Sequence, residues 1–207
     1  MNRPARPGSP AQPPADFAQR TLEIVHLGAG LVLSRIHRSR HAPLYFGRET
    51  HPERRQRWDA PDARYGVCYI SEDGPIAFAE TLLLDLKLDA IPQAEFRVRS
   101  LARLQVRAPL RLAAMHGKAL RAHGADASVV QGPYPITWDW SAAFHAHPSA
   151  PDGIYYRARH DDSGFSIALF DRARAKVEHT GSVGLLDAMF AHGLARWLDR
   201  YGVALTS

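Results

Sequence analysis

Features that mark several common protein classes are scarce or missing in this 207-residue sequence. It contains one cysteine, Cys68, so no disulfide forms within the chain, which fits a reducing compartment. No apolar run approaches the roughly 18 residues of a membrane helix. The N-terminal segment MNRPARPGSPAQPPADFAQR lacks the apolar stretch of a secretory signal. Motifs of the GxGxxG, P-loop and GxSxG types are also missing. We therefore expect a cytoplasmic protein that is not bound to a membrane.

Lysine is scarce as well, since it accounts for three of the 26 basic residues of a chain with formal net charge +5. Proteins that bind nucleic acid usually carry basic stripes interleaved with aromatic residues, and we expect no direct nucleic-acid contact here. Arginine instead suits fork-like recognition of phosphate or carboxylate. Residues 35–64 hold eight arginines against four acidic residues, an excess that attracts a small polyanion. A GC-rich genome or a solvated arginine-rich loop explains the same excess, so these alternatives stay open.

Two histidine pairs have spacings that occur in metal sites, His37 with His41 and His145 with His147. The first pair follows a strand-like segment and has no acidic or cysteine ligand close by. The second pair precedes a proline at a predicted helix end. We therefore expect no metal site. Cys68 falls on a predicted buried strand, which favours a small core residue over a nucleophile.

The first 16 residues differ in composition from the rest of the chain. Five of the 15 prolines fall there, together with glycine, serine, alanine and glutamine, so this segment cannot form a core. No internal repeat and no second linker of this kind is visible. The sequence predicts a disordered tail over residues 1–16 and one domain over residues 17–207, which is long enough to bury a core.

Hydrophobic periodicity predicts strands and helices in an irregular order. The predicted strands cover residues 31–36, 66–70, 153–159 and 165–170, with one or two exposed strands within 94–106. The predicted helices cover residues 76–84, 110–123, 137–147 and 182–201, with Thr137 as an N-cap and Gly124 and Gly202 as helix stops. The strands lack the regular alternation with helices of a doubly wound fold. The predicted class is α+β, with a mixed or antiparallel sheet core and flanking helices.

Two stretches carry the chemistry of the sequence, RWDAPDARYGVCYISEDGPIAFAE over residues 57–80 and DGIYYRARHDDSGFSIALFD over residues 152–171. The first holds Arg57, then Tyr69 on a predicted strand, then Glu80 on the predicted helix that follows. A carboxylate in the second turn of a mostly apolar helix is costly unless it faces a cleft or has a partner. Arginine, tyrosine and glutamate together suit a site that grips an anionic nucleotide and stabilises a sugar cation. Each residue also has an ordinary structural reading: a half-buried tyrosine, a helix-surface glutamate and a paired arginine.

The two stretches resemble the RES domain over roughly residues 33–173. That family is named for an arginine, a glutamate and a serine, and it is typically a bacterial toxin paired with an Xre-type antitoxin. The resemblance implies a fold like that of ADP-ribosyltransferase toxins. It also implies that NAD is the substrate, without a further cofactor, and that inorganic phosphate is a co-substrate where the reaction is phosphorolysis. Arg57, Tyr69 and Glu80 match the family arginine, tyrosine and glutamate, and Arg35 matches an arginine near the domain start.

The resemblance implies a role for each matched residue. Glu80 would stabilise the oxocarbenium-like state when the nicotinamide–ribose bond breaks. Arg57, with Arg35, would hold the pyrophosphate or an attacking phosphate, and Tyr69 would stack on the nicotinamide or bond the ribose. It further implies a cleft blocked by the antitoxin, and it is compatible with a homodimer or a larger toxin–antitoxin complex.

The sequence departs from the family at the serine, because Ala158 occupies its position in YRARHD. Ser163 and Ser166 lie nearby, but a shift in strand parity is expected to place them on another face or in the turn. Gln56 also replaces the usual glycine before the arginine. The serine is then an auxiliary group, or the enzyme is weakened, or the alanine is a deliberate substitution. Two alternatives to NAD degradation remain: transfer of ADP-ribose to a protein, and a pseudoenzyme that binds NAD or the antitoxin without chemistry.

Overall fold

The computed structural model describes residues 12–85 and 89–207. Most of the predicted tail, residues 1–11, lies outside the described residues. The first element, a 3-10 helix over Phe17–Gln19, buries Phe17 in the core. No helix in the described part of the chain combines the length and apolar character needed to cross a membrane.

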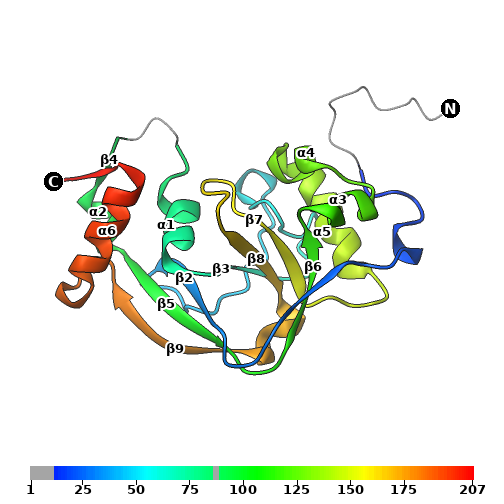
Figure 1. Cartoon of the computed structure of the whole chain (residues 1–207), viewed down its shortest axis with the longest axis horizontal. Coiled ribbons are helices and arrows are strands. Elements are labelled where there is room, and N and C mark those ends of the chain that lie inside the picture. The colour runs from blue at the N-terminus through cyan, green and yellow to red at the C-terminus, as the bar shows by residue number, and fades with distance from the viewer. Residues whose placement is uncertain (1–11, 86–88) are drawn as a thin grey trace.

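Most strands join one eight-stranded mixed sheet, in the order β1-β6-β7-β8-β3-β2-β5-β9 (Figure 1). Its strands are β1 (Ile24–Leu27), β2 (Val32–Arg38), β3 (Val67–Ser71), β5 (Arg99–Val106), β6 (Leu110–Met115), β7 (Gly153–Arg157), β8 (Phe165–Phe170) and β9 (Val177–Gly184). The β6–β7 pair is parallel and the other pairs are antiparallel. A second, two-stranded sheet joins β4 (Ala90–Pro92) to β10 (Ala204–Thr206). The α+β class with a mixed sheet is confirmed.

The helices form two groups at opposite ends of the sheet (Figure 1). One group contains α1 (Gly74–Leu82), α2 (Gln93–Arg97) and α6 (Ala191–Tyr201), and the other contains α3 (Lys118–His123), α4 (Ala127–Gln131) and α5 (Tyr134–Ala146). Further 3-10 turns cover η2 (Pro52–Arg54), η3 (Asp171–Lys176) and η4 (Ala188–Phe190). The β7–β8 hairpin lies between the two groups (Figure 1).

The two faces of the sheet have different partners because successive strand residues alternate between faces. One face carries Leu33, Cys68, Ile70 and Ile167, which belong to a core cluster built mainly of strand residues. The opposite face packs against helices through two other clusters. The first cluster lies under α4 and α5 and includes the fully buried Trp140, and the second lies under α1, α2 and α6. The candidate site lies on this helix-bearing face, between the two helix groups.

The predicted helix over residues 110–123 is wrong in its first half. Leu110–Met115 is strand β6, which pairs with β1 and β7, and only Lys118–His123 is helical. Leucine, alanine and methionine favour helices locally, but a central strand buried on both faces offers this apolar run more burial. The predicted stop is confirmed, since Gly124 ends α3 in the left-handed conformation with φ 88°.

The predicted helix over residues 182–201 is also wrong in its first half. Residues Val177–Gly184 form edge strand β9, and α6 begins at Ala191. The predicted apolar stripe does pack into the core through Leu185, Leu194 and Trp197, but Met189 is 93% exposed. Gly202 ends α6 with φ 62°, as predicted.

Two smaller predictions also need correction. Residues Gln93–Arg97 form the short helix α2, and one strand, β5, follows it. Helix α5 begins earlier than predicted, after Pro133, so Thr137 is not its N-cap. The hydroxyl of Thr137 instead donates to the carbonyl of Tyr134 within the first turn.

Candidate active site

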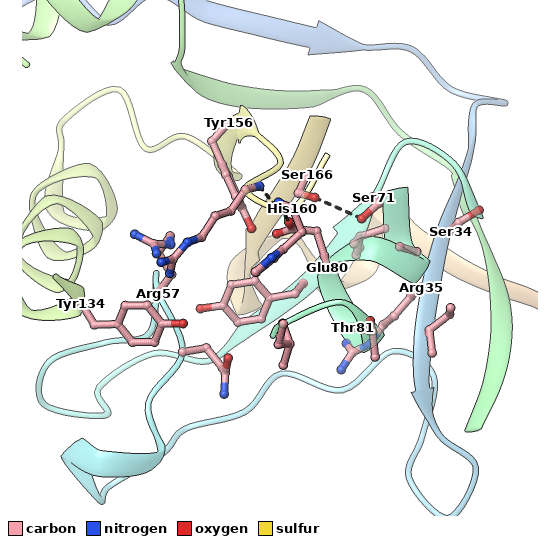
Figure 2. A pocket seen from close by; sticks show the side chains of 17 residues that line it. Ser34, Arg35, Arg57, Ser71, Glu80, Thr81, Tyr134, Tyr156, His160 and Ser166 are labelled. Atoms are coloured by element: carbon pink, nitrogen blue, oxygen red, sulfur yellow. Dashed lines mark hydrogen bonds between the residues drawn. The ribbon is translucent and has the colours of Figure 1, made fainter. Parts of the chain in front are cut away.

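A cleft of about 280 Å³ opens on the helix-bearing face of the sheet (Figure 2). Its lining comes from strands β2, β3, β7 and β8, helix α1, the start of α5, and two loops. The lining residues are Ser34, Arg35, Ile36, Gln56, Arg57, Tyr69, Ile70, Ser71, Ala77, Glu80, Thr81, Leu84, Tyr134, Tyr156, Arg159, His160 and Ser166. The cleft therefore brings Arg35, Arg57, Tyr69 and Glu80 together, as the sequence predicts.

A row of hydroxyl side chains crosses the floor of the cleft. Directly opposed residues of paired strands share one face, and the register pairs Ser34 with Ser71, Ser71 with Ser166, and Ser166 with Tyr156. The Oγ atoms of Ser71 and Ser166 are 3.1 Å apart (Figure 2). Ser166 thus faces the cleft, so its expected placement on another face is wrong. Ser163 does lie in the hairpin turn, where it bonds Asp161.

Arg57 is a buried cation that forms no ion pair within the part of the chain that the structure describes. Its side chain is 6% exposed, its Nη1 donates to the carbonyl of Gly132 at 3.1 Å, and its guanidinium lies 4.9 Å from the ring centre of Tyr134. Its Nη2 is buried without a hydrogen-bond partner among the described residues. Burial, followed by repulsion from Arg159, lowers the pKa of Arg57. Attraction from Glu80 offsets part of this positive charge, and a bound anion would neutralise it further.

Tyr69 and Asp59 hold the loop that carries Arg57. The Tyr69 hydroxyl donates to Oδ1 of Asp59 at 2.8 Å and accepts from the backbone N–H of Trp58 at 2.8 Å. Oδ2 of Asp59 accepts from the backbone N–H of Gln56 at 2.7 Å. Burial raises the pKa of Asp59 and raises that of Tyr69 well above its ordinary value. Because its hydroxyl is already bonded on both sides, Tyr69 offers the cleft its ring rather than a free hydroxyl.

Glu80 faces the cleft from α1 and holds the hairpin loop on the other side. The helix begins with an aspartate N-cap, since Asp73 accepts from the backbone N–H of Ile76 at 2.9 Å. Oε1 of Glu80 accepts from the backbone N–H groups of Arg159 and His160, at 2.7 and 2.8 Å. Oε2 accepts no hydrogen bond in the parts of the chain that the structure describes. Glu80 therefore combines a loop anchor with an unused carboxylate oxygen in one side chain.

Arg35 lines the cleft, but its guanidinium makes its contacts elsewhere. It pairs across the sheet next to Ser34, so its side chain belongs to the face opposite the cleft floor. Its Nη1 donates to the carbonyl of Tyr45 at 3.1 Å and also contacts Sγ of Cys68. Cys68 is fully buried, as predicted, and burial raises the pKa of its thiol. The guanidinium of Arg35 thus braces the strand-side core, although the residue contributes to the cleft lining.

Ala158, at the expected serine position, lies behind the cleft and not in it. It is 2% exposed, and its backbone N–H donates to the carbonyl of Gly164 across the hairpin. It lines a second, neighbouring cavity that also touches Arg159 and His160. Ala158 therefore lies at the base of the loop that Glu80 anchors, directly before Arg159 and His160.

The tip of this hairpin is fixed from the other side by α6. Oδ2 of Asp161 accepts from Arg200 at 2.9 Å and from the Tyr201 hydroxyl at 2.7 Å. Against the effect of burial, bonds from Ser163, Tyr201 and Arg200 lower the pKa of Asp161 to about 2. At the hairpin's turn, a Cβ on Gly164 would overlap Ile76, so the close packing on α1 requires glycine there. The loop carrying Arg159 and His160 is thus clamped between α1 and α6.

This clamp predicts a pH-dependent contribution of Asp161 to stability. A carboxylate whose pKa is lowered by folding stabilises the protein above its ordinary pKa, and this contribution is lost as the pH falls toward the folded-state value. We expect Asp161→Asn to lower the free energy of unfolding at pH 7, and the difference from wild type to shrink between about pH 4 and pH 2. Urea unfolding across this range measures it. Asp162→Asn is the matched control, and an equal response in both variants would contradict the clamp.

Several lining residues were missed from the sequence. Tyr156, Arg159 and His160 fall within the second motif, but the family resemblance marks only the position of Ala158 there. Burial lowers the pKa of His160 and raises that of Tyr156 well above its ordinary value. Tyr134 comes from the start of α5, far from both motifs, and no local pattern marks it. Strand alternation in FSIALF was the available signal for Ser166.

The arrangement places positive and negative groups on different walls of one cleft. Figure 2 shows Arg57 with Tyr134 on one side and Glu80 with Thr81 on another. Arg57 can bind an anionic group and Glu80 can stabilise positive charge that develops near it. The aromatic lining of Tyr69, Tyr134 and Tyr156 can pack against planar rings. No cluster of three or more metal-binding side chains occurs among the described residues.

Comparison with known proteins identifies the family and a similar fold. A model of the RES domain matches residues 32–187. The fold is similar to that of a chain in the crystal structure of the M. tuberculosis MbcT–MbcA toxin–antitoxin complex. The TM-score is 0.61 at 14% sequence identity, and the alignment covers 82% of this chain and 92% of the other. No curated protein sequence matches the chain significantly.

Proposed function

Because this chain belongs to the RES domain family, we propose that it degrades NAD by cleaving the nicotinamide–ribose bond, as the toxin of a bacterial toxin–antitoxin pair. The observation that carries the proposal is the pairing of two groups in one cleft. Arg57 is a buried cation with an unbonded Nη2 and no ion pair among the described residues, and Glu80 has a carboxylate oxygen that accepts no hydrogen bond there. A substrate with an anionic pyrophosphate next to a sugar that becomes cationic complements both groups.

The roles follow from the contacts. Arg57, braced by Gly132 and by the ring of Tyr134, binds a phosphate oxygen. As the bond to nicotinamide breaks, positive charge develops on the ribose, and Oε2 of Glu80 stabilises it. Tyr69 keeps the loop of Arg57 in place through Asp59 and presents its ring to the cleft. Arg35, whose guanidinium bonds on the opposite face, holds the sheet and not the substrate in this scheme.

The acceptor of the ADP-ribosyl group is water or inorganic phosphate, and one assay decides between them. Purified protein is incubated with NAD with and without phosphate, and nicotinamide release is measured. We expect NAD loss, and a rate that rises with phosphate concentration identifies phosphorolysis. Label that moves from NAD onto an added protein would favour ADP-ribosyl transfer instead. Absence of NAD loss under all conditions would refute the proposal.

The partner in this proposal is an antitoxin protein that covers the cleft. The similar fold was solved in a toxin–antitoxin complex, and family members are typically paired with an Xre-type antitoxin. A bound antitoxin would compete with the substrate for Arg57. We therefore expect co-purified antitoxin to suppress NAD loss.

Restoring a hydroxyl at position 158 is expected to raise the rate of NAD cleavage modestly. Ala158→Ser places one hydroxyl at the base of the loop anchored by Glu80, and one hydrogen bond contributes about 1 kcal/mol, or about fivefold in rate. We expect kcat to rise by about that factor. A rise of two orders of magnitude would instead identify the present chain as a disabled enzyme. Ala122→Ser, at an exposed position of α3, is the control.

A further inference from the structure

A second and larger cavity adjoins the cleft at the hairpin loop. This cavity has a volume of about 880 Å³, against about 280 Å³ for the cleft. Arg159 and His160 line both cavities. Sites for drug-sized ligands usually span about 300–1,000 Å³. The cleft alone is therefore small for a dinucleotide, whereas the two spaces together are not.

The boundary between the two cavities is positively charged. Arg159 is exposed and forms no ion pair within residues 12–85 and 89–207, and its backbone is held by Glu80. Its charge is near enough to contribute to the lowered pKa of Arg57. Glu80 attracts Arg57 and thereby offsets part of this charge, but neither guanidinium forms an ion pair among the described residues, so the two groups together can bind a doubly charged anion. The pyrophosphate of a dinucleotide has this charge.

The wall of the second cavity combines an apolar patch with a larger set of polar and charged residues, among them Asp161, Asp162 and Arg200. The apolar residues come from β6, α3 and α4 and are Met115, Leu120, Ala127 and Val130. His116 and Gln131 also line it, and Nε2 of His116 is buried without a hydrogen-bond partner in the described chain. The apolar patch can pack against a purine base, and the donors and acceptors around it can bond the polar edges of the base and the ribose.

We propose that the second cavity binds the adenosine half of the dinucleotide, with Arg159 at the pyrophosphate and the nicotinamide riboside half in the cleft. This inference rests on the proposed function where it places the nicotinamide riboside half in the cleft, but the purine site is tested independently. The chemistry recognised is a purine nucleoside 5′-phosphate. Adenosine monophosphate is therefore the probe, since it contains no bond that the cleft would cleave.

Filling the cavity tests the proposal. Ala127 is exposed and lines the cavity at the start of α4, so Ala127→Trp occupies the space without entering the core. Ala122→Trp is the matched control, because Ala122 is exposed on neighbouring α3 and does not line the cavity. We expect calorimetry to show adenosine monophosphate binding to wild type and Ala122→Trp, and at least tenfold weaker binding to Ala127→Trp.

A kinetic comparison separates this inference from the proposed function. Nicotinamide mononucleotide carries the same scissile bond as NAD but lacks the adenosine half. We expect Ala127→Trp to lower the ratio of kcat/KM for NAD to kcat/KM for the mononucleotide about tenfold or more. If adenosine monophosphate binds but NAD is not cleaved, the purine site is supported and the proposed function is rejected. NAD cleavage with no binding of adenosine monophosphate and an unchanged ratio would overturn the purine site alone.

Discussion

Replacing Glu80 by glutamine is expected to lower kcat for nicotinamide release by about 10²–10³-fold, the usual effect of removing one group that stabilises transition-state charge. Glutamine keeps an oxygen that accepts from the backbone N–H groups of Arg159 and His160, so the loop stays anchored. It removes the negative charge that Oε2 offers to the ribose cation. The expected loss is in kcat, with little change in KM, because the interaction strengthens only as the bond breaks.

Comparison with Glu80→Ala separates the two functions of this side chain. Alanine removes both the charge and the loop anchor, so it is expected to lose activity and also to expose the hairpin to proteolysis. Glu53→Gln, at an exposed position on η2, is the control for the loss of one carboxylate. If Glu80→Gln keeps more than a tenth of the wild-type kcat, Glu80 serves only as a loop anchor and the catalytic role is wrong.

The segment from β3 to α1 was predictable because its signals are local. Alternation of residues marks β3, and Asp73 followed by glycine and Pro75 marks the helix start within a few residues. The apolar stripe of α1 then places Glu80 beside Ala77 and Leu84 on the side that faces the cleft. The grouping of Arg57, Tyr69 and Glu80 in one site followed from the family resemblance and not from these signals.

Strands β6 and β9 were not predictable in the same way. The segment LRLAAM suits a helix locally. It becomes a strand only through its pairing with β1 and β7, both of which lie more than 30 residues away in the sequence. Edge strand β9 carries an exposed VEHTGSVG sequence whose partner is β5. Such pairings are decided by the tertiary structure.

The side-chain assignments depended on strand parity. A register shift of one residue moves a side chain to the other face of a sheet. Ser34 therefore faces the cleft while Arg35, its neighbour, contacts Cys68 on the other side. The same rule brings Ser166 into the cleft, opposite to the expectation. Tyr134 and its contact with Arg57 join segments far apart in the sequence, and no single-sequence pattern indicates that contact.

Arg57→Met is expected to weaken NAD turnover strongly while leaving the free protein as stable as before, or more stable. The contacts of the buried guanidinium are one carbonyl bond and one aromatic face, which contribute about 1.5–3 and about 0.5–2 kcal/mol, and attraction from Glu80 adds to them. Desolvation of a buried ion costs several kcal/mol. The lowered pKa of Arg57 points in the same direction. It means that folding disfavours the charged form of the side chain, which is the form present at neutral pH. Methionine has a similar length and carries no charge, so its burial avoids this cost.

The two readouts of this variant should therefore move in opposite directions. We expect kcat/KM for NAD to fall at least 10²-fold, and Tm to stay constant or to rise by about 2–4 °C, which corresponds to about 1 kcal/mol in a chain of this size. ADP-ribose should raise the Tm of wild type but not that of Arg57→Met, because the anion no longer meets a cation. Arg54→Met, at an exposed position three residues away, should leave activity and Tm unchanged. A clear fall in Tm would show that Arg57 stabilises the fold, and its unpaired charge would then not mark a site kept for the substrate.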